Sequence, residues 1–220
     1  MIAKLLSYLI PVTIHKAKSP LSKTLEVTWN NGRLVLDSEN ANYSFGSLQQ
    51  ILKKGLRFIG FERIRNFESI LVLGVAGGSV IKTLVDDVKF EGKITGIEID
   101  AEVITLANKY FDLDKIQNLE LIIGDAFEFV LRTKDKYDLI IIDVFFDTTM
   151  PNFLFEDYFI HRVQFLMNLN GFILFNTMVL TEKDKLRNSL YKEKFVNDYS
   201  IRMYPKVEEH NELFTIKKLR

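Results

Sequence analysis

Acidic residues follow three successive apolar segments of the chain, each at the point where the segment ends. A carboxylate in such a position can accept hydrogen bonds from a ligand, or take a proton from an attacking nucleophile. A buried carboxylate without donors is costly, so these positions favour ligand binding. The residues are Glu98 and Asp100 after one segment, Asp125 after the next, and Asp143 and Asp147 after the one that follows.

An earlier apolar segment, residues 70–73, is followed by Gly74, Gly77 and Gly78. Glycines allow a backbone to approach a ligand closely. Their spacing is neither G-x-x-x-x-G-K-[ST] nor G-x-G-x-x-G, so neither a nucleoside triphosphate loop nor the ordinary dinucleotide fingerprint is expected. Glu98 lies 24 positions after Gly74, close to where an acid meets a ribose hydroxyl in nucleotide-binding folds. The pattern therefore predicts a nucleoside site.

Several of these residues also have a purely structural interpretation. Gly77 and Gly78 could serve only to pack a strand tightly against a helix. Asp100 and Asp125 each precede a helical pattern and could be helix caps. Asp138 opens its strand at the opposite edge of the sheet, and we interpret it as structural. For Glu98 we favour the functional interpretation.

From residue 70 onward, apolar strand patterns alternate with helical patterns. Near-continuous Ile, Leu and Val runs indicate parallel strands covered on both faces, and right-handed crossovers then give a doubly wound α/β sheet. The last two strand patterns, residues 199–205 and 211–219, are joined by five residues. Such a connection permits an antiparallel pair but no parallel crossover. The sequence thus predicts a mainly parallel, seven-stranded sheet whose five parallel strands span residues 70–74, 93–100, 119–125, 137–143 and 171–178.

Residues 1–46 differ from the rest and are predicted to form a small N-terminal β-hairpin region, with residues 47–220 as the main domain. Leu25, Val27 and Trp29 alternate along one strand, and Asn31-Gly32 is typical of a type I′ turn into a returning strand. Apolar residues then recur at helical spacing over 48–59.

The amino-acid composition excludes several classes of function. Lysine plus arginine equals aspartate plus glutamate at 29 each, so no net field favours nucleic acid or an anionic membrane. Cysteine is absent, which excludes thiolate metal sites and a cysteine nucleophile. His15, His161 and His210 have no metal-ligand spacing, so no metal is expected. The N-terminal apolar run is short and broken by Pro11, so we expect a cytoplasmic protein without a membrane span.

Residues 70–177 resemble the spermidine synthase family, a branch of the class I methyltransferase fold, which is Rossmann-like. Where that family has GGGDGG, E-[IV]-D, GD and YDxIIxD in order, this chain has "GVAGGS", "EID", "GDAFEF" and "YDLIIID". Downstream, "PNFLFEDYF" resembles the family's proline, Leu-Phe and aromatic pattern. The predicted hairpin also stands where the family places its small β-domain.

The resemblance implies a site for S-adenosylmethionine, its decarboxylated form, or methylthioadenosine. It implies that Glu98 holds the ribose and that Asp125, with the backbone of Ala126, binds the adenine amino group. It further implies close backbone approach at Gly74, Gly77 and Gly78, and proton removal from an attacking amine by Asp143. Family members often pair through their N-terminal β-domains, so a homodimer is a further expectation.

Some positions depart from the family pattern. Gly77 stands where the family's turn carries the aspartate that helps to bind the aminopropyl group, and "VFFD" follows Asp143 in place of S-S-D-P. A second amine-binding acid is therefore lost or displaced to Asp147. The family's tyrosine-histidine-glutamate signature is absent, with Tyr43 and Gln49 as candidate lining residues.

These departures lead to a main hypothesis of S-adenosylmethionine-dependent methyl transfer to an unknown, apolar or aromatic small molecule. Methyl transfer chiefly needs a nucleophile positioned in line with the sulfonium methyl group, so it tolerates the loss of amine-binding acids. One alternative is an aminopropyltransferase, a polyamine synthase that uses decarboxylated S-adenosylmethionine. The other is a non-catalytic nucleoside-binding or interaction protein.

Overall fold

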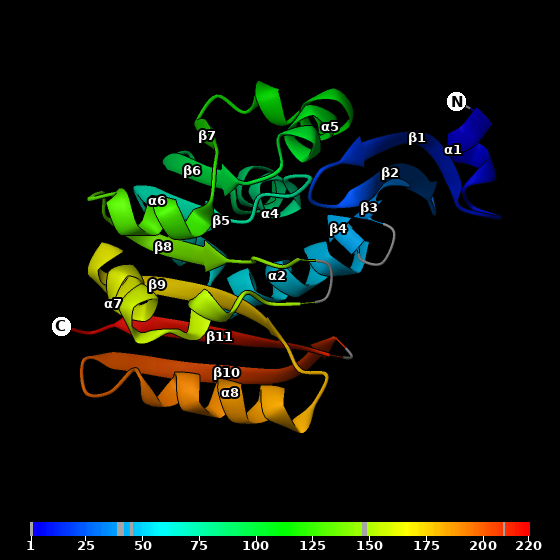
Figure 1. Cartoon of the computed structure of the whole chain (residues 1–220). Helices are drawn as coiled ribbons and strands as arrows, with labels where there is room; N and C mark the ends of the chain where they lie inside the picture. The colour runs from blue at the N-terminus through cyan, green and yellow to red at the C-terminus, as the bar shows by residue number, and fades with distance from the viewer. Residues whose placement is uncertain (1, 39–41, 45, 147–148, 209) are drawn as a thin grey trace.

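The computed structural model describes residues 2–38, 42–44, 46–146, 149–208 and 210–220, which form two β-sheets and the helices that pack on them (Figure 1). The smaller sheet projects from one end of the larger one and carries the short helix α1 (Ile2–Leu6). Its four strands follow one another in chain order: β1 (Val12–Ser19), β2 (Lys23–Asn30), β3 (Arg33–Ser38) and β4 (Asn42–Ser44).

The predicted hairpin is confirmed as the antiparallel pair β2–β3, with Asn30 opposite Arg33. Asn31 and Gly32 have φ angles of +49° and +75°, as a type I′ turn requires at both central positions. β1 and β4 were not predicted. β1 is mostly exposed, so its residues lack the apolar alternation that marks a half-buried strand.

The larger sheet has the order β10-β11-β9-β8-β5-β6-β7. Its last five strands in this order, from β9 to β7, are parallel, and β11 pairs antiparallel with both β9 and β10. The predicted seven-stranded, mainly parallel sheet is therefore confirmed. Its strands are β5 (Ser69–Leu73), β6 (Lys93–Glu98), β7 (Leu119–Ile123), β8 (Tyr137–Ile142), β9 (Met167–Met178), β10 (Tyr199–Glu208) and β11 (Asn211–Lys218).

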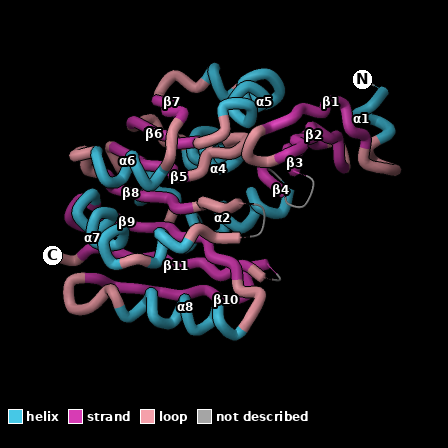
Figure 2. Tube along the Cα trace, viewed as in Figure 1, coloured by secondary structure: helices cyan, strands magenta, loops and turns pink. Residues whose placement is uncertain are grey.

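Helices cover both faces of this sheet (Figure 2). One face packs against α2 (Gly46–Ile59), α3 (Phe61–Arg65), α4 (Ser79–Lys82), the π-helix η1 (Thr83–Val88) and α5 (Ala101–Phe111). The other packs against α6 (Ala126–Arg132), α7 (Asp157–Leu166) and α8 (Glu182–Glu193). The 3₁₀ turns η2 (Leu113–Lys115) and η3 (Asn152–Phe155) complete the elements. Within the described residues, no helix is long and apolar enough to cross a membrane.

The small sheet packs on α5. Leu25, Val27 and Leu36 share a buried cluster with apolar residues of that helix. Beside the cluster, the hydroxyl groups of Ser19 and Ser22 both donate to Oδ2 of Asp100, the residue that caps α5. A charged residue at the end of β6 is thereby joined to the N-terminal sheet. The contact holds the two sheets together next to the predicted nucleoside site.

Asp37 on β3 yields a prediction about stability. Burial, aided by the charge of Glu26, raises its pKa from 3.8 to about 6, and its buried Oδ1 has no partner among the described residues. The folded chain therefore binds a proton that the unfolded chain releases between about pH 4 and 6, so this group lowers stability as pH rises through that window. Asp37→Asn should raise the free energy of unfolding at pH 7.5 by about 1–2 kcal/mol.

Denaturant titrations at pH 4 and pH 7.5 would measure this effect. The exposed Asp114 provides the control, because Asp114→Asn should change stability by less than about 0.5 kcal/mol at either pH. A loss of stability at pH 7.5 in Asp37→Asn would show that the carboxylate is better accommodated than its surroundings indicate.

Candidate functional site

The turn after β5 is shaped by two glycines with left-handed backbone. Gly74 has φ +84° and Gly78 has φ +83°. A side chain at Gly74 would overlap the carbonyl oxygen of Asp143, and one at Gly78 would lie 2.6 Å from a methyl group of Leu113. Gly77 is outside the group of positive-φ glycines, whereas Ala76 has φ +48°. Close packing thus accounts for Gly74 and Gly78, whereas the structural interpretation from the sequence had named Gly77 and Gly78.

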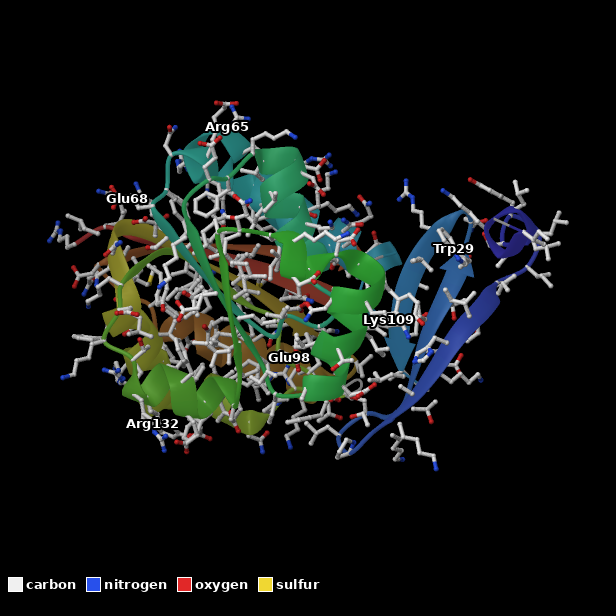
Figure 3. All side chains as sticks on the ribbon, turned by 90° about the horizontal axis from the view of Figure 1, so that it is seen from above. Trp29, Arg65, Glu68, Glu98, Lys109 and Arg132 are labelled. Atoms are coloured by element: carbon white, nitrogen blue, oxygen red, sulfur yellow. The ribbon has the colours of Figure 1, made fainter. Side chains whose placement is uncertain are left out.

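Glu98 lies at the end of β6 and accepts hydrogen bonds from that turn. Its Oε2 accepts from the backbone nitrogens of Val75 at 3.1 Å and Ala76 at 2.9 Å, and its Oε1 accepts from the nitrogen of Asp100 at 3.0 Å. The side chain is only 7% exposed, and Figure 3 shows it beside the base of α5. The carboxylate therefore has donors within the chain itself, which the sequence did not reveal.

The surroundings of Glu98 both raise and lower the pKa of its carboxyl group. Burial raises its pKa, while the backbone hydrogen bonds from Asp100 and Ala76 lower it. The result is a raised pKa in a carboxylate held rigidly between the glycine turn and α5. A ribose role for Glu98 stays a prediction, and it would require these backbone donors to be shared with or exchanged for hydroxyl groups.

Replacing Glu98 by glutamine gives the second stability prediction. An amide has one acceptor oxygen, so at least one of the three backbone N–H groups would face an NH₂ group or lose its acceptor. An unsatisfied buried donor costs about 1–3 kcal/mol, and for a chain of this size each kcal/mol lowers the melting temperature by about 2–4 °C. Loss of the charge acts in the opposite direction, because the pKa of Glu98 is raised, and it offsets part of this cost. We expect the lost hydrogen bonds to prevail, so that Glu98→Gln melts a few degrees lower in a thermal scan without ligand.

Glu128 on α6 is the matched control, because its carboxylate is half-exposed and, among the residues that the structure describes, forms an ion pair only with the exposed Arg132. Glu128→Gln should change the melting temperature by about 1–2 °C at most. Equal melting temperatures for Glu98→Gln and the wild type would mean that the turn does not depend on the carboxylate.

The structural interpretations of Asp100 and Asp125 are supported directly. Asp100 accepts from the nitrogen of Glu102 at the start of α5, and Asp125 accepts from the nitrogen of Phe127 at the start of α6. Asp125 is exposed and Ala126 beside it is buried. The free oxygen of an exposed cap remains accessible to a ligand, so the predicted adenine contact stays a prediction.

Asp143 follows β8 directly, next to the glycine turn. Its backbone nitrogen donates to the carbonyl of Leu73, and its Oδ1 accepts from Nδ2 of Asn176 at 2.8 Å. Burial and the charge of Glu98 raise the pKa of Asp143 from 3.8 to about 6, although the hydrogen bond from Asn176 opposes them. A carboxyl group that titrates near 6 is ionised at neutral pH and can accept a proton.

The remaining predicted site residues are Gln49, Tyr43 and Asp147, and Gln49 is the one among them whose side chain the structure describes. Nε2 of Gln49 on α2 donates to Oγ1 of Thr83 at 3.3 Å. Tyr43 belongs to β4, but its side chain is outside the described residues, as is all of Asp147. Phe145 packs against the core, whereas Phe146 is 46% exposed. A lining role for Tyr43, Gln49 and Asp147 therefore stays a prediction.

Two asparagines near Asp143 were missed by sequence reasoning. Asn176 on β9 is fully buried, and its Oδ1 accepts from Nδ2 of Asn211 on β11 at 3.0 Å. A buried amide in an otherwise apolar strand, "GFILFNTM", is the signal that could have pointed to Asn176, because such a group needs hydrogen-bond partners. Asn211 carried no comparable signal.

The sheet order and site together define a class I S-adenosylmethionine-dependent methyltransferase-like fold. A spermidine synthase solved in complex with the transition state analogue AdoDATO has this fold, with a TM-score of 0.70 and 18% identity over 94% of this chain and 72% of that chain. A family model for the spermine/spermidine synthase domain matches residues 49–218. The chain belongs to the spermine/spermidine synthase domain family.

Two relatives with curated names are similar over part of their length. The polyamine aminopropyltransferase of Vibrio vulnificus is 27% identical over 139 residues, which are 62% of this chain and 46% of that protein. The polyamine aminopropyltransferase of Buchnera aphidicola subsp. Acyrthosiphon pisum is 31% identical over 144 residues, which are 59% of this chain and 50% of that protein. The chain spans about half the length of the curated relatives it matches.

These findings correct the main functional hypothesis. Methyl transfer was inferred from Gly77 and from the apolar residues after Asp143, but the named relatives are aminopropyltransferases and the family is that of spermine and spermidine synthases. The hypothesis of methyl transfer is therefore wrong, and the alternative of aminopropyl transfer is the better supported one. A missing acid in one turn shows that a contact has changed, but it does not show which group is transferred.

Proposed function

We propose that this chain binds decarboxylated S-adenosylmethionine at the carboxyl end of its main sheet and transfers the aminopropyl group to an amine. The observation that carries the proposal is Asp143, a carboxyl group with a raised pKa of about 6, placed against Gly74 in the turn of the predicted nucleoside site. The names of the similar aminopropyltransferases support it.

The chemistry uses that carboxylate directly. The amine lone pair attacks the carbon next to the sulfonium, the C–S bond breaks, and methylthioadenosine leaves with the bonding electron pair. Protonated amines predominate at neutral pH and have no lone pair to donate. An ionised Asp143 within reach of the amine orients it and accepts its proton, so the rate should rise as pH increases through about 6.

The nucleoside contacts belong to the same proposal. Glu98 and the turn of Gly74, Gly77 and Gly78 would meet the ribose and the chain on sulfur, and Asp125 with Ala126 would meet the adenine. Support comes from their common position at the carboxyl ends of β5, β6 and β7, where ligands bind in open α/β sheets.

A thermal-shift panel and a product assay test the proposal. The panel contains S-adenosylmethionine, its decarboxylated form, S-adenosylhomocysteine and methylthioadenosine. All are used at one concentration, about 100 times the dissociation constant of the decarboxylated form, where binding stabilises by about 2.7 kcal/mol. We expect the melting temperature to rise by about 5–10 °C with decarboxylated S-adenosylmethionine and methylthioadenosine. Incubation with putrescine should release methylthioadenosine and an aminopropylated amine, detected by mass spectrometry. No shift and no release would overturn the proposal.

We also propose that the chain self-associates through its N-terminal region. Ile2, Leu5, Leu9 and Ile10 of α1 and the segment after it are each at least 65% exposed, and so many exposed apolar side chains within ten residues favour an interaction site. Light scattering after gel filtration should give twice the monomer mass. A monomer at micromolar concentration would contradict this.

A further inference from the structure

Three polar side chains form a row across neighbouring strands of the main sheet, at the end that holds the candidate site. Asp143 directly follows β8, and Asn176 and Asn211 belong to β9 and β11, the next two strands in the sheet order. Residues two apart on a strand point to the same face. Each member of the row is two positions from a residue of the core beneath α2, namely Ile141, Leu174 and Leu213.

Two hydrogen bonds join the three side chains, and both donate toward Asp143. Nδ2 of Asn211 donates to Oδ1 of Asn176 at 3.0 Å, and Nδ2 of Asn176 donates to Oδ1 of Asp143 at 2.8 Å. A carboxamide has a donor end and an acceptor end. Because Asn211 donates to the oxygen of Asn176, the NH₂ end of Asn176 must face Asp143. Asn176 is also fully buried, whereas Asp143 and Asn211 are partly exposed.

We propose that Asn176, oriented by Asn211, is a positioning residue that holds Oδ1 of Asp143 as an acceptor and leaves Oδ2 to receive the proton of the attacking amine. The proposal rests on the proposed aminopropyl transfer. Among the described residues, no hydrogen bond is made to Oδ2 of Asp143. One oxygen is thus anchored by the sheet, and the other is available to a ligand at the carboxyl end of β8.

The row also stabilises the charged form of Asp143. The only charged side chain that acts appreciably on this carboxyl among the described residues is Glu98, and it disfavours ionisation, as burial does. The amide of Asn176 is the single opposing contact. Without it, the pKa of Asp143 should move further upward, so that less of the base is ionised at neutral pH.

Carboxyl carbon NMR titrations test the inference without any substrate. The Asp143 resonance, assigned by its loss in Asp143→Asn, is followed through pH in the wild type, Asn176→Ala and Asn211→Ala. A lost hydrogen bond to a charged group should raise the pKa of Asp143 by about 1 or more in Asn176→Ala. Asn211→Ala should raise it by less, because the amide stays but is free to turn.

Asn168 supplies a matched control on the same two strands. Its Nδ2 donates to Oδ1 of Asp138 at 2.8 Å. This is the same kind of bond between β9 and β8, but it lies at the opposite end of these two strands. Asn168→Ala should leave the pKa of Asp143 at its wild-type value. If Asn176 proves intolerant of alanine, the half-buried Asn211 still tests the row.

Activity then separates a positioning role from a structural one. In Asn176→Ala and Asn211→Ala that remain active, the acid limb of the pH profile of kcat should shift to higher pH. The shift should equal the change in the pKa of Asp143 measured by NMR, with KM for the nucleoside unchanged. An unchanged pKa of Asp143 in Asn176→Ala would overturn the inference, and equal values for Asn211→Ala and Asn168→Ala would remove Asn211 from it. A wild type without aminopropyl transfer would refute the proposed function, while the NMR titrations would still decide whether the row orients Asp143.

Discussion

Asp143→Asn should lower the rate of aminopropyl transfer by about 10²- to 10⁴-fold, the usual contribution of a positioned general base. Asparagine nearly matches the shape of aspartate and can still accept from Nδ2 of Asn176, so the site keeps its packing. It cannot take a proton from the amine. Steady-state kinetics with decarboxylated S-adenosylmethionine and an amine at pH 8 measure the loss, which should fall on kcat rather than on KM for the nucleoside.

The same substitution should make the folded chain more stable at neutral pH. The pKa of Asp143 is about 6 in the folded chain against 3.8 for an ordinary aspartate, so the folded state binds the extra proton between those values and loses stability as pH rises through them. Removing the charge should recover up to about 2–3 kcal/mol at pH 7.5 and nothing at pH 3. Denaturant titrations at both pH values check this.

Asp138 at the other end of β8 is the control for that substitution. Its carboxylate accepts from the backbone nitrogens of Glu68 and Ser69 and from the side chain of Asn168, which confirms its interpretation as structural. Asp138→Asn should therefore lower stability, because an amide cannot accept all three bonds. If Asp143→Asn also lowered stability at pH 7.5 while leaving transfer intact, the assignment of Asp143 as a general base with a raised pKa would be refuted.

The larger sheet could be predicted from the sequence because the apolar pattern that marks each parallel strand lies within that strand. Runs such as "ILVLG" and "LIIID" bury both faces of a parallel strand and need no partner to be recognised. The hairpin was equally local, since Asn31-Gly32 specifies its own turn. β1 and β4 were missed because they are held by pairing with β2 and β3 rather than by a pattern of their own.

The candidate site was predictable only in part, because its contacts join elements that are distant in sequence. Glu98 was recognised from its place at a strand end, but its backbone donors at Val75 and Ala76 depend on how the turn folds back. The contact between Asn176 and Asn211 depends on β11 inserting beside β9, which no periodicity reveals. The methyl-transfer hypothesis failed for a related reason, since the departures at Gly77 and after Asp143 were read without the geometry around them.

Gly74→Ala should be the most destabilising single substitution in the turn. The residue has φ +84°, which costs a non-glycine residue about 1–2 kcal/mol. The added methyl group would also overlap the carbonyl oxygen of Asp143 and lie 2.9 Å from its carbonyl carbon. This neighbour is backbone at the junction of β5 and β8, so it cannot turn aside as a side chain would.

The total cost should exceed about 4 kcal/mol, in the range that marks an exceptional substitution, and the chain should be largely unfolded or insoluble at 37 °C. Gly124→Ala is the control, because nothing lies within 4 Å of a side chain there, and it should melt within about 2 °C of the wild type. Circular dichroism melts of both variants decide the matter. A well-folded Gly74→Ala with normal stability would mean that β5 and β8 can separate at this junction. Asp143 would then not be held against the turn, and its proposed role would lose its geometric basis.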